Sequence, residues 1–293
     1  MKKGKLFALA CLGLCFLLII SACQSIAPFD DPPVSNHPPG EPPVAPPKPP
    51  IPPPVPKPSA NLDNTLRPFD GFRRNNQNLQ PEIYMPRQYI EAYDCVVLGS
   101  PLQKRIYLTF DAGYEAGFTG KILDALQAEC VTAAFFLTGD YIKKNPTLVQ
   151  RMHREGHVLA NHSMTHPHLS QVDLSTLEWE VSQVEILYQQ LGVDSSPFLR
   201  PPYGSYSQRT LAWTRYMGYI NVFWSMAYKD WDEKNQPGAD YAYNHVITNL
   251  HPGAVILLHT NSGSNAEAMA RILAEVKAKG YEFGSLYEFI PAD

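Results

Sequence analysis

The chain has 293 residues with 24 basic and 28 acidic side chains, a formal net charge of −4 at pH 7. Removing the three lysines among the first five residues leaves 21 basic against 28 acidic side chains, a charge of −7. An acidic chain without a concentrated basic patch excludes the usual electrostatic basis of nucleic-acid binding, and we expect no nucleic-acid partner.

The N-terminus has the pattern of a targeting segment, residues 1–22. Lysines at positions 2, 3 and 5 precede a long apolar run over 6–20, and small residues stand directly before Cys23. The pattern resembles a bacterial lipoprotein signal, which predicts lipidation of Cys23 and attachment to the outer face of the cell membrane. An ordinary secretory signal and an uncleaved membrane anchor are the alternatives. All three place the rest of the chain outside the cytoplasm.

Residues 23–60 form a proline-rich linker, followed by a polar lead-in over 61–104 with a predicted strand at 94–98. At ~3.1 Å per residue, a polyproline II segment from Pro28 to Pro58 would reach on the order of 90 Å. A semi-rigid spacer is the favoured interpretation, and partner recognition through Pro-x-x-Pro the alternative. Cys95 and Cys130 either form a disulfide or stay as two buried thiols.

From residue 105 onwards, β-rich and helical patterns alternate. Strands are predicted at 105–111, 131–137, 157–160, 198–200, 220–224 and 254–258, and helices at 119–129, 208–217, 241–250 and 266–279. A further helix ends near Gly156, and another opens with a capping box at Ser175 and Glu178 and carries an apolar core stripe. Such β-then-α units imply a parallel sheet. Roughly seven strands over ~190 residues are too few for an eight-fold barrel of ~250, so we expect a single α/β domain with an incomplete or distorted barrel.

Five short motifs fall at or just after the ends of the β-rich runs. They cover residues 109–111, 161–166, 200–204, 229–231 and 257–260. The strand-to-helix loops of an α/β barrel meet at one mouth, so these motifs are predicted to form one site.

The first two motifs supply a carboxylate and a histidine pair. Asp111 can take a proton from water that attacks a carbonyl, or it can cap a helix. His162 and His166 are four residues apart and can converge on one cation, or they can be structural or surface residues.

The later motifs supply groups that orient and donate protons. Arg200, fixed by the prolines that follow it, suits bidentate orientation of a carboxylate, and the Tyr203 backbone N–H suits an oxyanion; a rigid surface turn is the alternative. Asp230 can orient an imidazole, whereas Trp231 fits either a substrate wall or the core. His259 ends a buried strand and is predicted to protonate a departing amine.

Together these motifs resemble those of the polysaccharide deacetylases of the NodB-homology type, carbohydrate esterase family 4, over residues 105–293. The resemblance implies a distorted (β/α)₇ barrel that hydrolyses the acetyl group from an N-acetylated sugar. It further implies that Asp111 is the base, Arg200 its partner and His259 the general acid, held by Asp230. His162 and His166 would be the metal ligands. The Tyr203 amide would help to form the oxyanion hole, and Trp231 and Leu257 would line the acetyl pocket.

One position departs from the family pattern. The second aspartate of the usual Thr-Phe-Asp-Asp motif, a metal ligand, is Ala112 here. The resemblance implies a divalent metal, and the two histidine ligands favour zinc. The replacement of the usual aspartate by Ala112 predicts that the metal binds more weakly or not at all. Alternatively, the two imidazoles hold a metal together with substrate oxygens and water.

Residues 109–115, 223–231 and 251–260 are similar to one branch of the family, the δ-lactam-biosynthetic de-N-acetylases, which act on N-acetylmuramic acid of peptidoglycan. That branch tolerates loss of the second aspartate. Its product amine can close onto the lactyl carboxyl to give muramic δ-lactam. We therefore expect a monomeric, membrane-tethered peptidoglycan deacetylase that binds glycan strands. The alternatives are a deacetylase of N-acetylglucosamine or acetylated xylan, a wall-binding pseudoenzyme, and a scaffold for other wall proteins.

Overall fold

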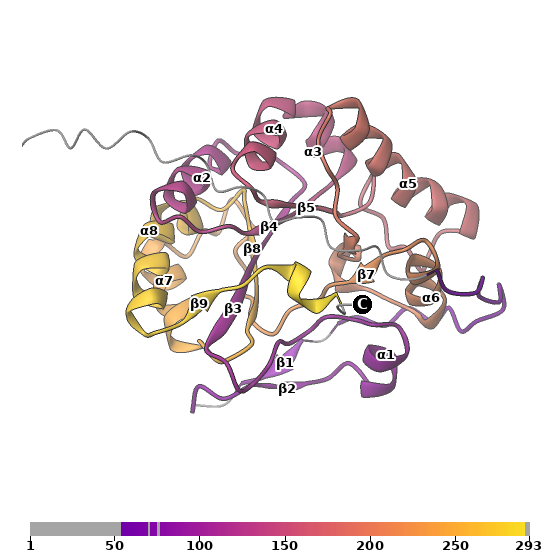
Figure 1. The fold of residues 1–293 in the computed structure, drawn as a ribbon, viewed down its shortest axis with the longest axis horizontal. Coiled ribbons are helices and arrows are strands. Elements are labelled where there is room, and N and C mark those ends of the chain that lie inside the picture. Colours follow the sequence, from indigo (N-terminus) through magenta and orange to yellow (C-terminus); the bar gives the residue numbers. More distant parts are fainter. Residues whose placement is uncertain (1–53, 70, 75–76, 291–293) are drawn as a thin grey trace, which may run out of the picture. The chain divides into compact units, whose positions relative to one another are not determined.

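Strand β3 (Arg105–Ala112) pairs with three other strands in the computed structural model, which describes residues 54–69, 71–74 and 77–290 (Figure 1). The strand order is β7-β6-β5-β4-β3-β8, with β9 also paired to β3, and every pairing is parallel. The other strands are β4 (Ala134–Leu137), β5 (Val158–Asn161), β6 (Phe198–Leu199), β7 (Ile220–Asn221), β8 (Val255–His259) and β9 (Glu282–Phe283). The predicted parallel sheet of about seven strands is confirmed.

The sheet curls until its two ends meet. In the segment that follows β7 (Ile220–Asn221), Met226 forms a parallel bridge to Ile256 of β8, and its carbonyl accepts a hydrogen bond of 2.9 Å from the Leu257 N–H. Closure through a bridge rather than a full strand pair makes the barrel irregular. The expected distorted (β/α)₇ barrel in a single domain is therefore confirmed.

Alternation along β3 separates the core from the site. Leu108 and Phe110 pack into the largest apolar cluster, where the Phe110 ring stacks on Phe135 with 5.1 Å between ring centres. Thr109 and Asp111 point to the other face, where both contact Arg200. Because side chains alternate between the two faces of a strand, Thr109 and Asp111 lie together with Arg200 as a buried polar cluster on the inner face of the barrel.

Helices lie around the outside of the curled sheet (Figure 1). They are α2 (Thr119–Ala128), α3 (Gly139–Lys144), α4 (Pro146–Arg154), α5 (Leu174–Gln190), α6 (Gln208–Tyr216), α7 (Ala239–Thr248) and α8 (Gly263–Ala278). The predicted stripe of α5 does face the core, because Leu177, Val181 and Val184 are fully buried. In the described part of the chain, no helix is both long and apolar enough to cross a membrane.

The predicted capping box of α5 is wrong. The helix begins at Leu174, and its N-cap is Asp173, whose carboxylate accepts hydrogen bonds from the Thr176 N–H at 2.7 Å and the Ser175 hydroxyl at 2.8 Å. A carboxylate two residues upstream satisfies the first-turn donors, so Ser175 lies inside the helix.

The secondary structure of the lead-in, residues 61–104, differs from the prediction. Residues 94–98 form no strand but two isolated bridges, Val96 to Val222 and Leu98 to Ala254. Two short strands absent from the prediction, β1 (Phe72–Arg73) and β2 (Glu82–Ile83), pair antiparallel and are followed by helix α1 (Arg87–Ala92). The predicted strand at 220–224 is only two residues long. Val222 still donates to the carbonyl of Leu199 in β6, but Phe223 donates to the Val96 carbonyl of the lead-in as the chain leaves the sheet.

The two cysteines of the folded part do not pair. Cys95 is a buried free thiol, whereas Cys130 is exposed and free. The expectation that Cys130 belongs to the core is wrong, because it occupies a left-handed turn after α2 with φ of 50°. The predicted signal, the lipidated Cys23 and the linker up to residue 53 lie outside the described residues.

Candidate active site

Asp111 and Arg200 form a buried ion pair at the carboxyl end of the sheet. The Arg200 Nη1 donates to Asp111 Oδ1 at 2.7 Å, while Nη2 donates to the Thr109 hydroxyl at 2.9 Å. The prediction that Arg200 orients a carboxylate bidentately is thus wrong, because the second donor binds Thr109. Arg200 itself is fully buried, and its Nε donates to the Val222 carbonyl at 3.1 Å. A guanidinium so completely bonded fixes the direction of the Asp111 carboxylate.

His162 and His166 bring their Nε2 atoms to 3.1 Å from each other. The His162 Nδ1 lies 2.8 Å from the Arg200 carbonyl, so this nitrogen carries the proton and Nε2 presents a lone pair. That lone pair also faces Asp111 Oδ2 at 3.4 Å. Burial, more than any charged neighbour, lowers the pKa of both imidazoles, for His166 to about 3. Both are therefore neutral at pH 7, as metal ligands must be.

The loop that carries the two histidines is held by a buried carboxylate on α5. Glu180 Oε2 accepts from the Thr165 N–H at 2.8 Å, and Oε1 accepts from the Thr165 hydroxyl. The Glu180 carbonyl also accepts from the Met164 N–H at 2.8 Å. Because Ser163 and His166 both have left-handed backbone, with φ of 65° and 62°, the loop needs such external support.

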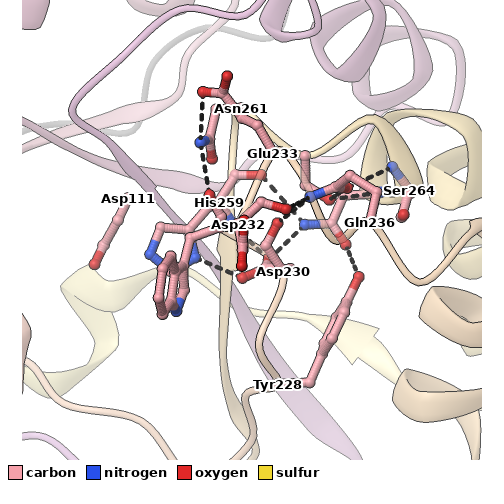
Figure 2. A network of polar contacts seen from close by, with 12 residues as sticks. Asp111, Tyr228, Asp230, Asp232, Glu233, Gln236, His259, Asn261 and Ser264 are labelled. Atoms are coloured by element: carbon pink, nitrogen blue, oxygen red, sulfur yellow. Dashed lines mark hydrogen bonds and ion pairs between the residues drawn. The ribbon is translucent and has the colours of Figure 1, made fainter.

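His259 is oriented by Asp230, with which it forms an ion pair (Figure 2). Its Nδ1 lies 2.7 Å from Asp230 Oδ1, and its backbone N–H donates to Asp230 Oδ2 at 2.8 Å. Asn265 donates to the same Oδ2 at 2.6 Å, and Gln236 donates to the Asp230 carbonyl at 2.6 Å. The side chain of Asp230 is fully buried, whereas 23% of the His259 side chain is exposed. This bonding leaves Nε2 as the histidine's free proton donor.

Asp111 and His259 are aligned residues of the neighbouring strands β3 and β8. Burial opposes ionisation of Asp111, but Arg200 and the nearby imidazoles outweigh it and lower the pKa of the carboxyl. Burial likewise opposes protonation of His259, but the Asp230 carboxylate outweighs it and raises the pKa of the imidazole. One strand end therefore presents a carboxylate whose ionised form is favoured, and the next an imidazole whose protonated form is favoured.

The remaining predicted residues surround this centre. Tyr203 lies in the turn after β6, and its ring is 4.5 Å from the His166 ring, centre to centre. Leu257 is buried on the same face of β8 as His259, as a pocket residue would be. Trp231 is 53% exposed, with the Lys229 ammonium 5.1 Å from its ring centre, so the alternative of a core tryptophan is wrong.

The donor set fits a cation held by two imidazoles. Without a cation, the His162 lone pair faces a carboxylate oxygen, an arrangement that a positive charge would relieve. A third protein ligand is missing: among the described residues, no three His, Cys, Asp or Glu side chains are grouped to hold a metal ion. Ala112, at the position of the expected third ligand, is buried in the apolar cluster.

Sequence reasoning missed three residues that position the site. Thr109 was within a quoted motif without a role, yet it links Arg200 to the Ile256 carbonyl by hydrogen bonds of 2.9 and 2.6 Å. Asn265 holds Asp230, and Glu180 holds the histidine loop. Glu180 alone carried a local signal, since an acidic residue placed between Leu177 and Val184 interrupts the apolar stripe of α5.

A carboxylate base and an imidazole acid, flanked by two further imidazoles at the mouth of a curled α/β barrel, suit hydrolysis by general acid–base catalysis without a covalent intermediate. Comparison with known families agrees. Residues 99–222 match the polysaccharide deacetylase family. The protein is 43% identical over 218 residues to the peptidoglycan-N-acetylmuramic acid deacetylase PdaA of Bacillus subtilis. The matched region covers 74% of this chain and 83% of the relative. The chain belongs to the polysaccharide deacetylase family, carbohydrate esterase family 4.

Other relatives support the same membership. A peptidoglycan-N-acetylglucosamine deacetylase of Bacillus cereus is 34% identical over 207 residues, 69% of this chain and 74% of the relative. The solved structure of B. subtilis PdaA, a family 4 carbohydrate esterase, has a TM-score of 0.74 and 41% identity, and covers 77% of this chain and 97% of that chain. This protein is therefore a deacetylase of the hydrolase class. Family members generally depend on a metal.

Proposed function

We propose that the protein removes the acetyl group from N-acetylmuramic acid in the glycan strands of peptidoglycan. The observation that carries the proposal is the aligned pair of Asp111 and His259, whose pKa values are shifted apart by Arg200 and Asp230. The preference for muramic acid is supported by the similarity to PdaA, which is named for that substrate. Loss of the acetyl group yields an amine that can close on the lactyl carboxyl, the δ-lactam chemistry.

The reaction is amide hydrolysis with one base and one acid. Asp111 takes a proton from water as the water oxygen attacks the acetyl carbonyl carbon. The Tyr203 N–H stabilises the oxyanion of the tetrahedral intermediate. His259 donates its Nε2 proton to the sugar nitrogen, the C–N bond breaks, and acetate and a free amine leave. Arg200 holds the base and Asp230 the acid throughout.

His162 and His166 would hold a divalent cation, and zinc suits two imidazole nitrogens. Such a cation, when bound, supplies a positive charge that polarises the acetyl carbonyl. With only two protein ligands, its affinity should be lower than that of a three-ligand site. Chelator should therefore remove it readily, and added zinc should restore activity.

The test is to incubate the purified protein with intact glycan strands and with strands stripped of stem peptides, each with and without chelator. Mass spectrometry then locates the deacetylated sugar. Acetate lost from muramic acid supports the proposal, whereas loss from N-acetylglucosamine would support the specificity of the B. cereus relative. Binding without acetate release would support a wall-binding pseudoenzyme, which the complete base and acid do not favour.

We further propose that the protein works as a lipid-anchored monomer on the outer face of the cell membrane. The supporting observation is the sequence before Cys23, a basic segment and an apolar run that end in small residues. A proline-rich linker would let the enzyme domain reach glycan strands at a distance from that anchor.

A further inference from the structure

Tyr203 is exposed and strained at the rim of the active site. Its side chain is 60% accessible, although the residue is large and partly apolar. Its backbone is left-handed, with φ of 60° and ψ of 7°, a conformation that is strained for a non-glycine residue. Neither burial nor backbone preference accounts for a tyrosine here, because glycine would adopt this turn without strain. The ring itself must therefore have a use at the surface.

The ring is braced from behind. His168 stacks on it with ring centres 4.2 Å apart and an interplanar angle of 27°. The His168 Nδ1 lies 2.8 Å from the Ser205 hydroxyl, which donates to the Pro202 carbonyl at 3.0 Å. His166 meets the Tyr203 ring edge-on, so the ring is fixed relative to the catalytic centre. A rigid ring loses little conformational entropy when it binds a ligand.

We propose that Tyr203, supported by His168, forms a stacking platform for a pyranose ring of the glycan strand. That ring belongs to the sugar adjacent to the one that loses its acetyl group. A pyranose presents an apolar C–H face with hydroxyls around its edge, which matches the flat face and polar tip of tyrosine. The platform adjoins His166, where a strand positioned for hydrolysis must pass. His168 is a positioning residue, since it acts through Tyr203. The inference rests on the proposed function, because it takes the glycan strand as the ligand.

The test measures binding of purified peptidoglycan glycan strands by calorimetry, in an Asp111→Asn background that prevents turnover. Adding Tyr203→Gly should weaken binding about tenfold, whereas Tyr203→Phe should bind like the background because the ring is kept. His168→Ala should weaken binding less than Tyr203→Gly, and His168→Phe should restore it. Trp179→Ala, which removes an exposed tryptophan from α5, is the control and should change nothing. Circular dichroism checks that each variant is folded.

Equal affinity of the Tyr203→Gly and background proteins would overturn the platform, as would strands that do not bind the background protein at all. The proposed function is judged separately, by acetate release from the protein with Asp111 intact. Release together with unchanged Tyr203→Gly binding would leave the function standing and remove the platform. Absence of release would remove the function, while the binding series would still decide whether Tyr203 stacks on sugar.

Discussion

Asp111 and His259 lie side by side on neighbouring strands, yet their surroundings shift their pKa values in opposite directions. Arg200 and the imidazoles lower the pKa of Asp111 against the effect of burial, and Asp230 raises that of His259 against the same effect. The difference comes from which charge each group contacts, since both lie in the same mouth. Acid and base roles are thereby assigned at one pH without any conformational change.

The pH profile tests this assignment. The raised pKa of His259 keeps the acid protonated above its ordinary 6.5, so activity should fall on the alkaline side only above that pH. Asp230→Asn removes the main stabilisation of the imidazolium, and its alkaline limb should move to lower pH. His259→Ala should reduce turnover by about 10²–10⁴-fold at the pH values where His259 is protonated, and by less on the alkaline side. Acetate release measured against pH checks both variants, and an unmoved limb in Asp230→Asn would contradict the role of Asp230.

Residues next to strand ends could be predicted from the sequence, whereas their supports could not. Asp111, His162, Arg200 and His259 each follow a β-rich run, and parallel strands bring such ends together. The contact of Asn265 with Asp230 depends on how α8 starts after β8, which no local pattern encodes. The departure at position 112 was visible in the sequence itself, and the weaker metal binding that it implies stays a prediction.

At the level of elements, the histidine loop depends on α5. Glu180 supplies acceptors for the Thr165 N–H and hydroxyl and is only 3% exposed, so it both bonds and orients the loop. Glu180 therefore belongs to the site, although it lies on helix α5, 15 residues after Thr165 and outside the five motifs. The stripe of α5 predicted its core face but not this second task.

Removing the Glu180 carboxylate should loosen the site. Glu180→Ala leaves the Thr165 donors without acceptors, which should cost about 1–3 kcal/mol of unfolding free energy and lower zinc affinity. Glu180→Gln keeps an acceptor oxygen and should show a smaller loss of both. Urea unfolding and zinc titration measure the two effects, with exposed Glu178→Ala on the same helix as the control. Equal zinc affinity in Glu180→Ala and the unmutated protein would show that the carboxylate does not position the histidines.

Element boundaries show where pattern reasoning stops. The start of α5 was misplaced because Asp173 and Ser175 are both good N-caps, and only the structure shows that Asp173 bonds Thr176. The strand at 220–224 was predicted too long because its β-rich composition continues where the backbone already bonds other segments. The β-rich composition of a segment shows that it can form a strand, whereas whether it pairs with another strand depends on its neighbours in space.

For the whole molecule, the alternating β and α patterns were sufficient to predict the barrel. Roughly seven parallel strands were expected and six were located in the sequence; β9 was not located, and the peripheral strand expected at 94–98 is not formed. Both segments are short and lie at the edge of the pattern, so side-chain periodicity cannot distinguish them. Closure of the barrel by the Met226 bridge likewise depends on curvature that the sequence does not display.

The membrane tether is a prediction for the whole chain. Cys23→Ser removes the thioether-forming sulfur, so the protein should move from the membrane fraction to the soluble fraction after cell lysis. Its activity on isolated strands should be unchanged, because the candidate active-site residues all lie between positions 109 and 265 of the sequence. Immunoblots of the fractions provide the measurement. A variant that stays in the membrane would indicate an uncleaved anchor, and an unmutated protein found only in the medium would indicate an ordinary secretory signal.

The most direct test of the account is acetate release from glycan strands by the Asp111→Asn protein compared with the unmutated protein. Asparagine retains an oxygen that can accept from Arg200 but cannot take a proton from water. The account predicts a loss of at least about 10²-fold in turnover with strand binding preserved. Turnover at the unmutated rate in a folded Asp111→Asn protein would contradict it, because the base would then lie elsewhere.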